Sequence, residues 1–497
     1  MEQYYGALLV EDAESSPDAP ETYKEAVTCA NKRHWEAAIT SEIDSLEKNG
    51  TWEFVKLPPD RKAIGSKWVF KLKTDEEGRI ARYKARLTAK GYAQVYGKDY
   101  FETYAPTSRY STLRIFLTLC LMHSLVLLQY DIKTAFLYGE LEEEIYMFPP
   151  SGICCPPDKV LRLRKSLYGL KQAPRVWNQH IHNTFTRLGG VNTREDECLY
   201  IFRDGDELVL VCLFVDDILL AFKGVKLRDR IVTALKGMYD IVELGTPKFC
   251  LGMKFEMNNN EIHLSQAAAV DKFLARFKLT DCTPVKIPME TSFEATPRDP
   301  DREPEANVPY RAGIGSLLYL SQCTRPDISY AVGVLARYSQ SPAERHWTAV
   351  QRVFKYLKGT RTYTLVFKKP SDWIPSYPQS RTDDRLEDTN DKVPVNPRSG
   401  TDDHHVTDHG LVAYSDASWA DDKVRRRSTS GYIFKYYGNM ISWMSKLQPI
   451  TTLSTCEAEY VGLCTASQEG LWIRKLLDSL GLPETRSFKI ELLGDNA

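Results

Sequence analysis

Residues 208–222 read LVLVCLFVDDILLAF, two apolar runs that flank the adjacent carboxylates Asp216 and Asp217. Apolar runs of this length that are rich in Val, Leu and Phe are typical of buried β-strands. Two carboxylates at the tip of a buried hairpin carry a desolvation cost unless a cation or donors compensate them. Mg²⁺ binds carboxylate oxygens together with substrate phosphates. The stretch therefore indicates either a metal-assisted phosphoryl-transfer site or an ordinary β-turn, in which Asp is common.

A third carboxylate follows another apolar run earlier in the chain. The stretch VLLQYDIKTAF (126–136) places Asp131 at the end of a predicted buried strand. An acid in that position is a natural third ligand for a site with two metal ions. Phe136 follows five residues later and could form the floor of a nucleotide pocket, although an aromatic residue there is more often part of the core.

Charge and cysteine usage narrow the class of protein. The 497 residues suggest about three domains. The net charge of −1 says nothing about partners, but residues 56–110 contain 13 Lys and Arg against six Asp and Glu, the footprint of a nucleic-acid binder or of a solvated face. The 11 cysteines show no CxxC pair, and Cys120, Cys212 and Cys250 lie in apolar runs. This predicts reduced core thiols and fits an intracellular protein. The longest apolar run, 115–128, is too short to span a bilayer.

Basic side chains recur at two places near the predicted strands. Residues 23–48 have helical periodicity, and 52–57, 67–73 and 80–89 are predicted strands. Alternation puts Arg82, Lys84 and Arg86 on one face of the third strand, where phosphate or only water could lie across them. The segment 166–177, SLYGLKQAPRVW, predicts a turn that opens a helix. Lys171 and Arg175 lie at its entry, available for phosphates or simply exposed.

Five blocks in order resemble the reverse transcriptase of copia-type LTR retrotransposons. They are KWVFKLKTDEEGRIARYKARLTAKGYAQ (67–94), QYDIKTAFLYG (129–139), SLYGLKQAPRVW (166–177), FVDD (214–217) and FCLGMKF (249–255). The resemblance implies an α+β fold, a right-hand polymerase of fingers, palm and thumb. Most family members have Tyr where this chain has Phe214.

The resemblance also implies roles for individual residues. Asp131, Asp216 and Asp217 match the metal-binding triad, which holds two Mg²⁺ ions and can accept Mn²⁺. The turn at 251–253 looks like the primer grip, and Phe136 matches the aromatic gate that selects deoxynucleotides. The other residues expected to meet the incoming dNTP are Lys73, Arg82, Lys84, Tyr168 and Lys171.

The C-terminal segment resembles the ribonuclease H region of the same family. Strands are predicted at 411–416, 429–437, 439–445 and 490–495, with a helix at 455–480. The motifs YSDASWADDKVRRRSTSGYIF, ISWMSKLQ, LSTCEAEY and GDNA carry the likeness. It implies that Asp416, Glu457 and Asp495 bind a second pair of Mg²⁺ ions, and Glu459 is expected to point to a different helix face. Because the chain stops at Ala497, we expect a truncated α/β ribonuclease H-like domain.

These observations predict five segments. They are an acidic, disordered leader at 1–22, fingers and palm at 23–257, thumb or connection helices at 258–370, a disordered acidic linker at 371–409, and the ribonuclease H-like domain at 410–497. Helices are predicted at 112–128 and at 264–279, the second with Ser265 as its N-cap. A further linker is expected at 281–309. The candidates for contact with a duplex are Arg345, His346, Arg352, Lys355 and Lys358, of which His346 is more often an ordinary residue of a helix face.

The implied function is RNA-directed DNA synthesis. The implied partners are an RNA template, a DNA primer, dNTPs, the RNA–DNA hybrid and other parts of the polyprotein, with no membrane. The location is a cytoplasmic particle or the nucleus. The alternative is a catalytically inactive remnant of a retroelement that at most binds nucleic acid.

Overall fold

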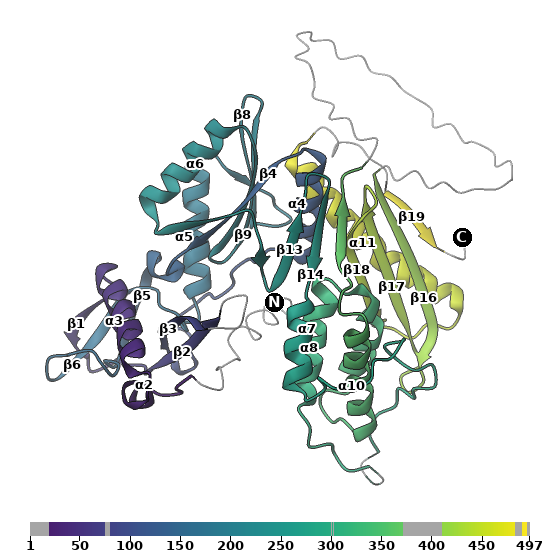
Figure 1. The fold of residues 1–497 in the computed structure, drawn as a ribbon, viewed down its shortest axis with the longest axis horizontal. Helices are drawn as coiled ribbons and strands as arrows, with labels where there is room; N and C mark the ends of the chain where they lie inside the picture. The colour runs from purple at the N-terminus through teal and green to yellow at the C-terminus, as the bar shows by residue number, and fades with distance from the viewer. Residues whose placement is uncertain are drawn as a thin grey trace.

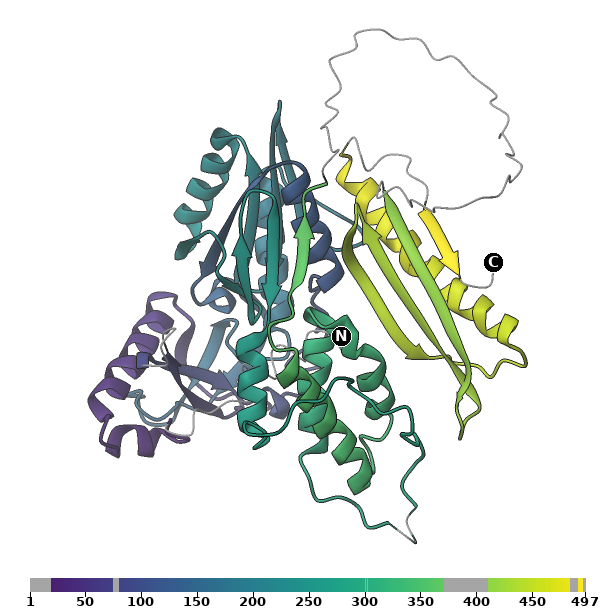
Figure 2. The same cartoon turned by 45° about the vertical axis from the view of Figure 1, so that its right-hand side comes forward.

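Helices and sheets are mixed along the whole chain, which confirms the predicted α+β class (Figure 1). The computed structural model describes residues 19–74, 80–299, 301, 303–370, 410–482 and 490–494. Most of the predicted leader, the 371–409 linker and Asp495 lie outside the described residues. In Figures 1 and 2 the N-terminal lobe and the helices after residue 258 lie below a large sheet, at the left and the right, which matches the fingers, thumb and palm of a right-hand arrangement.

The fingers lobe combines helices with two small sheets, ordered β1-β6-β5 and β2-β3. Buried Trp35 meets the rings of Phe70 and Tyr83 edge-on, with centroid distances of 5.3 and 4.8 Å, and so fixes its helix across the β2–β3 hairpin. The elements are α2 (Tyr23–Thr28), α3 (Lys32–Lys48), β1 (Trp52–Lys56), β2 (Ser66–Thr74), β3 (Ile80–Ala89), β5 (Glu140–Met147) and β6 (Lys159–Lys165).

The prediction of one continuous helix over 23–48 is wrong. The chain forms two helices there, α2 and α3, with a break at Cys29. The Cys29 backbone is extended, with ψ of 171°. Just before the break, the Thr28 hydroxyl donates to the Lys24 carbonyl at 2.8 Å. Such local side-chain bonds compete with continuation of a helix.

The palm is a sheet in the order β11-β4-β10-β9-β8-β7. Figure 1 shows α5 (Ala173–Arg187) and α6 (Val225–Met238) beside it. Val211 and Leu213 pack with these helices, whereas Leu210 and Cys212 join the cluster that contains α4 (Tyr110–Met122). Burial on both faces explains the continuous apolar runs. The strands are β4 (Val126–Ile132), β7 (Val191–Asn192), β8 (Leu199–Asp204), β9 (Glu207–Phe214), β10 (Asp217–Lys223) and β11 (Ile241–Gly245).

The predicted hairpin at 208–222 is confirmed as β9 and β10, whereas the helix predicted from 112 to 128 ends earlier, at Met122. After this helix Ser124 has a positive φ of 51°. The left-handed conformation cannot continue a helix. The chain therefore turns there and enters β4.

The thumb region contains a sheet ordered β12-β13-β14-β15 and several helices. The helix predicted over 264–279 with Ser265 as its N-cap is wrong at its start, because Ser265 ends a strand. Ile262 and Leu264 of that strand are buried, and the helix begins only at Ala267. The elements are β12 (Phe249–Cys250), β13 (Met253–Met257), β14 (Glu261–Ser265), β15 (Leu365–Lys368), α7 (Ala267–Arg276), α8 (Tyr310–Cys323), α9 (Ser329–Ala336) and α10 (Glu344–Gly359).

Cations on α10 hold the 281–309 segment against the thumb. Arg345 donates to the Pro297 carbonyl at 2.8 Å and pairs with Glu303 at 2.9 Å, which lowers the pKa of Glu303 to about 2. Arg352 pairs with a carboxylate of this segment, and Lys358 donates to a carbonyl in it. These side chains already have partners within the protein, so we assign them to the fold rather than to duplex contact.

The ribonuclease H-like domain has a sheet ordered β18-β17-β16-β19, with β19 parallel to β16. The long helix after residue 454 approaches the sheet closely because small residues face the strands. At Gly470, for example, an added Cβ would lie only 3.2 Å from the Phe434 ring. The predicted elements are confirmed as β16 (Leu411–Asp422), β17 (Arg427–Tyr436), β18 (Asn439–Leu447), α11 (Thr455–Leu480) and β19 (Ile490–Gly494). Among the described helices, none is both long and apolar enough to cross a bilayer.

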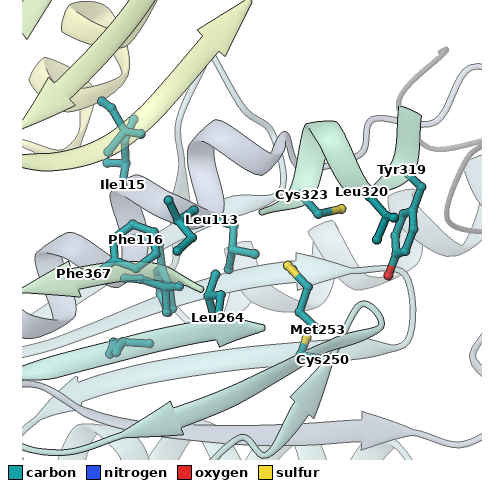
Figure 3. Close-up of a cluster of buried hydrophobic side chains, with 14 of the residues drawn as sticks. Leu113, Ile115, Phe116, Cys250, Met253, Leu264, Tyr319, Leu320, Cys323 and Phe367 are labelled. Carbon is teal, nitrogen blue, oxygen red and sulfur yellow. The ribbon is translucent and has the colours of Figure 1, made fainter. Parts of the chain in front are cut away.

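The ribonuclease H-like domain packs against the palm and the thumb around α4. Residues 111–122 of this helix are all buried. Arg114 donates to the carbonyls of Ile441 (3.1 Å), Cys323 (3.0 Å) and Gln322, and lies 3.7 Å from the Trp443 ring centroid. A single hydrophobic cluster contains side chains of the palm, the thumb and the ribonuclease H-like domain, part of which Figure 3 shows. The two domains therefore share one core.

Candidate active sites

Three carboxylates meet at one end of the palm sheet. Asp131 of β4 is the direct partner of Asp217 of β10 in an antiparallel pair. Residues that face each other in such a pair project to the same side of the sheet. Asp216 is next in the turn, and its carbonyl accepts from the Ile132 amide at 2.9 Å. The structure thus brings Asp131 next to the two acids that lie 85 and 86 positions later in the sequence.

The turn that carries Asp216 is held rigidly by its surroundings. Val215 has a positive φ of 59°, an unfavourable conformation for a β-branched residue. The buried Trp177 of α5 donates its ring N–H to the Val215 carbonyl at 2.6 Å. Strain of this kind persists only where neighbouring contacts impose it. The strained turn is thus fixed in one conformation beside the acids.

Electrostatics at this end of the sheet favour a bound cation. Burial raises the pKa of Asp216, and the charge of Asp131 raises it further. Gln129 donates its side-chain amide to Asp217 at 3.2 Å. Two close, partly desolvated carboxylates repel each other unless a positive charge lies between them.

The fingers contribute cations to the same place. Lys84 and Arg86 of β3 both act to lower the pKa of Asp216. The Arg86 guanidinium lies 3.8 Å from the centroid of the Tyr168 ring, and that ring meets Phe136 edge-on at 4.8 Å. Arg86, Tyr168 and Phe136 therefore form one contiguous wall beside the acids. Arg86 was not among the residues predicted to contact the dNTP. Alternation along the strand places it on the same face as Lys84, and this shared face is the sequence signal that could have identified it.

Two glycines allow the fingers to approach the 166–172 turn. The Ala89 amide donates to the Tyr168 carbonyl at 2.7 Å. Gly169 has a φ of +90°, and a Cβ there would lie 2.2 Å from the Ala89 carbonyl oxygen. A Cβ on Gly91 would lie 2.0 Å from the Gly169 carbonyl oxygen. Only glycine fits at these positions, which explains how β3 reaches the acids.

The structure places the other basic residues predicted to contact phosphates in different surroundings. Lys171 donates to the Tyr100 hydroxyl at 2.9 Å, and Arg175 to the Tyr104 carbonyl at 3.3 Å, so both hold the loop before α4. Arg82 is exposed on β3, opposite Lys73 in the strand register. The structure does not describe the side chain of Lys73.

The acids fit a metal ion that substrate helps to hold. Within the described ranges, no group of three or more His, Cys, Asp and Glu side chains is arranged to bind a metal ion. Mg²⁺ is usually bound by one or two carboxylates with water and substrate phosphates, rather than by a complete protein cage. Adjacent carboxylates at a strand end, with the pKa of one raised, suit that mode of binding.

The second site differs from its prediction at the helix. Asp416 is exposed on β16. Glu459 accepts a hydrogen bond from the Ala417 amide at 3.3 Å, so its carboxylate lies at the peptide bond between Asp416 and Ala417. The two acids do lie on different faces of the helix, as predicted, but Glu459 and not Glu457 is the one that contacts strand β16. The exposed Glu457 instead accepts from the Leu453 amide at 2.7 Å, while its own amide donates to Ser454 at 3.1 Å. Glu457 is therefore engaged at the start of the helix.

A sequence signal for Glu459 existed. Ala458, Gly462, Ala466 and Gly470 recur every four residues on α11 and are all buried against the sheet. A residue three positions before Gly462 lies on that same side of a helix. Small residues at this spacing mark the side that approaches the strands closely, and Glu459, unlike Glu457, borders it.

Comparison with known proteins identifies the family. Residues 49–291 match the family described as reverse transcriptase (RNA-dependent DNA polymerase). The putative transposon Ty5-1 protein YCL074W of Saccharomyces cerevisiae is 31% identical over 348 residues, 98% of its length and 68% of this chain. The chain belongs to the reverse transcriptases of retrotransposon Pol polyproteins.

Longer relatives match nearly the whole of this reverse transcriptase chain. The Pol polyprotein from transposon TNT 1-94 of Nicotiana tabacum is 36% identical over 93% of the chain, and that from RE2 of Arabidopsis thaliana is 35% identical over 92%. The chain spans only 33% and 29% of these polyproteins. A foamy viral protease–reverse transcriptase in complex with double-stranded DNA aligns with a TM-score of 0.44 and 11% identity, over 93% of this chain and 70% of that one.

Proposed function

We propose that this chain is an RNA-directed DNA polymerase of a copia-type retrotransposon that adds dNTPs to a primer 3′-hydroxyl. The observation that supports the proposal is the convergence of Asp131, Asp216 and Asp217 opposite Lys84 and Arg86 of the fingers. Carboxylates on one side and cations on the other suit a substrate that arrives as a metal-bound triphosphate.

In this proposal each group has a defined task. Asp131, Asp216 and Asp217 would hold two Mg²⁺ or Mn²⁺ ions. When bound, these ions lower the pKa of the primer hydroxyl and neutralise charge on the phosphates. Arg86 and Lys84 attract the triphosphate, and Arg86 is kept in place by the Tyr168 ring. The protein's own contribution is thus mainly positioning. Its nucleic-acid partners would be an RNA template and a DNA primer, whose sequence is copied by base pairing.

The direct test is extension of oligo(dT) on poly(rA) with dTTP and Mg²⁺. We expect extension that EDTA abolishes and that added Mg²⁺ or Mn²⁺ restores. Absence of extension from folded protein, with both ions, would favour an inactive remnant instead.

Phe136 should select the sugar of the incoming nucleotide. Its ring packs edge-on against Tyr168 beside the acids and is half-buried. We expect Phe136→Ala to raise kcat/KM for UTP relative to dUTP at least ~10-fold, because removing ring volume admits a 2′-hydroxyl. These two nucleotides differ only at that position, and poly(rA) templates both. Phe136→Tyr, which keeps the ring, should leave the ratio unchanged. An unchanged ratio in Phe136→Ala would remove Phe136 from the gate.

We further propose that the C-terminal domain cleaves RNA in an RNA–DNA hybrid, with Glu459 acting beside Asp416 in place of Glu457. Asp495 stays a proposed ligand from the sequence. We expect Glu459→Gln to reduce cleavage on the order of 100-fold or more, as loss of one charge-stabilising group does. Glu457→Gln should change cleavage less than threefold and lower the melting temperature slightly, since it weakens a helix cap. A labelled hybrid on a denaturing gel measures both. The reverse ranking of the two variants would restore Glu457.

A further inference from the structure

The β12–β13 hairpin has an unusual two-residue turn, Leu251-Gly252. Cys250 pairs directly with Met253, and both turn residues have positive φ, 51° for Leu251 and 70° for Gly252. These angles match a type I′ turn, for which Asn-Gly is preferred. A leucine in the first position is conformationally unfavourable. Something outside the hairpin must therefore stabilise this turn.

The stabilising contact comes from the thumb. Tyr319 of α8 is 5% exposed, and its hydroxyl donates to the Leu251 carbonyl at 2.9 Å. Figure 3 shows the Tyr319 ring directed from its helix toward the hairpin that carries Cys250 and Met253. A Cβ on Gly252 would lie 2.1 Å from the same hydroxyl oxygen, so only glycine permits this approach. One tyrosine thus couples the thumb helix to the tip of the hairpin.

The two faces of the hairpin have different characters. Cys250 and Met253 are buried under α8, at 3% and 0% exposure. Their neighbours Phe249 and Lys254 form the adjacent cross-strand pair and are both exposed. An exposed aromatic ring beside a cation can contact the bases and phosphates of nucleic acid. Lys254 itself pairs with the exposed Glu256 at 2.7 Å. The exposed face of the hairpin therefore offers a nucleic-acid strand chiefly the Phe249 ring, while its other face is fixed to the thumb.

We propose that Tyr319 is a positioning residue for the primer strand, which acts by holding the Leu251-Gly252 turn in its strained conformation. The proposal rests on the proposed polymerase function. Through this one hydrogen bond, the position of the thumb on the duplex sets the position of the hairpin near the primer end. Tyr319 touches no reacting atom and should affect primer binding without affecting nucleotide binding.

The chain offers a matched control on the same helix. Tyr310 of α8 is also buried, at 2% exposure, and its hydroxyl donates to the Leu335 carbonyl at 2.8 Å. Tyr310→Phe and Tyr319→Phe therefore remove the same group from similar surroundings. We expect similar decreases in melting temperature from both. Only Tyr319→Phe should weaken binding of a fluorescent primer–template, about fivefold, the effect of losing roughly one neutral hydrogen bond. The KM for dTTP should change less than twofold.

A double substitution separates positioning from general destabilisation. Leu251→Asn creates the Asn-Gly sequence that adopts this turn by itself. We expect Leu251→Asn/Tyr319→Phe to bind primer–template nearly as tightly as wild type, although the lost hydroxyl contact is not restored. Equal primer affinity in Tyr319→Phe and Tyr310→Phe, or no recovery in the double variant, would overturn the proposal. Binding is measured without turnover, so failure of wild type to extend a primer would count against the polymerase function alone.

Discussion

Asp216→Asn is expected to lower Mg²⁺-dependent primer extension by roughly a thousandfold, because one of the three carboxylates proposed to hold the ions loses its charge. Charge stabilisation by the metal is worth several kcal/mol, and ~4 kcal/mol corresponds to ~10³ in rate. The free energy of unfolding should not fall. Burial and the charge of Asp131 raise the pKa of Asp216, so its ionised form opposes folding, and a neutral amide relieves that repulsion. Lost activity with retained stability is the signature of a functional carboxylate.

A control for Asp216→Asn lies in the turn at the other end of strand β9. Asp206 is exposed in the β8–β9 turn, so Asp206→Asn changes the same chemical group far from the proposed site. Initial rates on poly(rA)/oligo(dT) and thermal melting should show full activity for this control. Wild-type rates from Asp216→Asn would discard the polymerase assignment. Loss of both activity and melting temperature would instead indicate a structural role for Asp216.

Arg114→Met is expected to reduce the free energy of unfolding by about 3–5 kcal/mol, because several buried carbonyls lose their donor at roughly 1–3 kcal/mol each. Arg114 is fully buried in α4, and burial lowers its pKa to about 9, which reflects the cost of desolvating the charge. Its bonds to Cys323 and Ile441, together with the Trp443 ring, offset that cost. Methionine fills similar space but leaves the buried carbonyls unpaired, which is expensive.

The effect of Arg114→Met should reach both of the proposed activities, since α4 packs on the palm, the thumb and the ribonuclease H-like domain. In urea, the first unfolding transition should move to a lower urea concentration. Primer extension and hybrid cleavage should both be lost above the lowered melting temperature. Arg230→Met is the surface control. Arg230 pairs with Asp204 at 2.8 Å and both are exposed, so its loss should cost less than ~1 kcal/mol. Similar unfolding curves for the two variants would show that the domains do not share a core through Arg114.

The amino-acid sequence alone determined the elements whose patterns are local. The β9–β10 hairpin, the end of β4 at Asp131 and the order of strands and helix after residue 410 all follow from runs and periodicities within a few residues. Because those strands pair side by side, the prediction that Asp131 meets the 216–217 turn also required little more than the pattern. Boundaries next to turns, such as those at Cys29 and Ser265, were less predictable, since local bonds there compete with the regular pattern.

Only the tertiary structure decided which partner each polar side chain takes. Glu457 and Glu459 are two residues apart, and packing of the small side of α11 on the sheet brings Glu459 to the backbone amide of Ala417, whereas Glu457 binds the Leu453 amide. Likewise Arg114 could be recognised as a buried link only once carbonyls from Cys323 and Ile441 surrounded it. The physical reason is the same in both cases. A pattern along the chain specifies which residues are buried, whereas the partner of a charge depends on groups that only folding brings near.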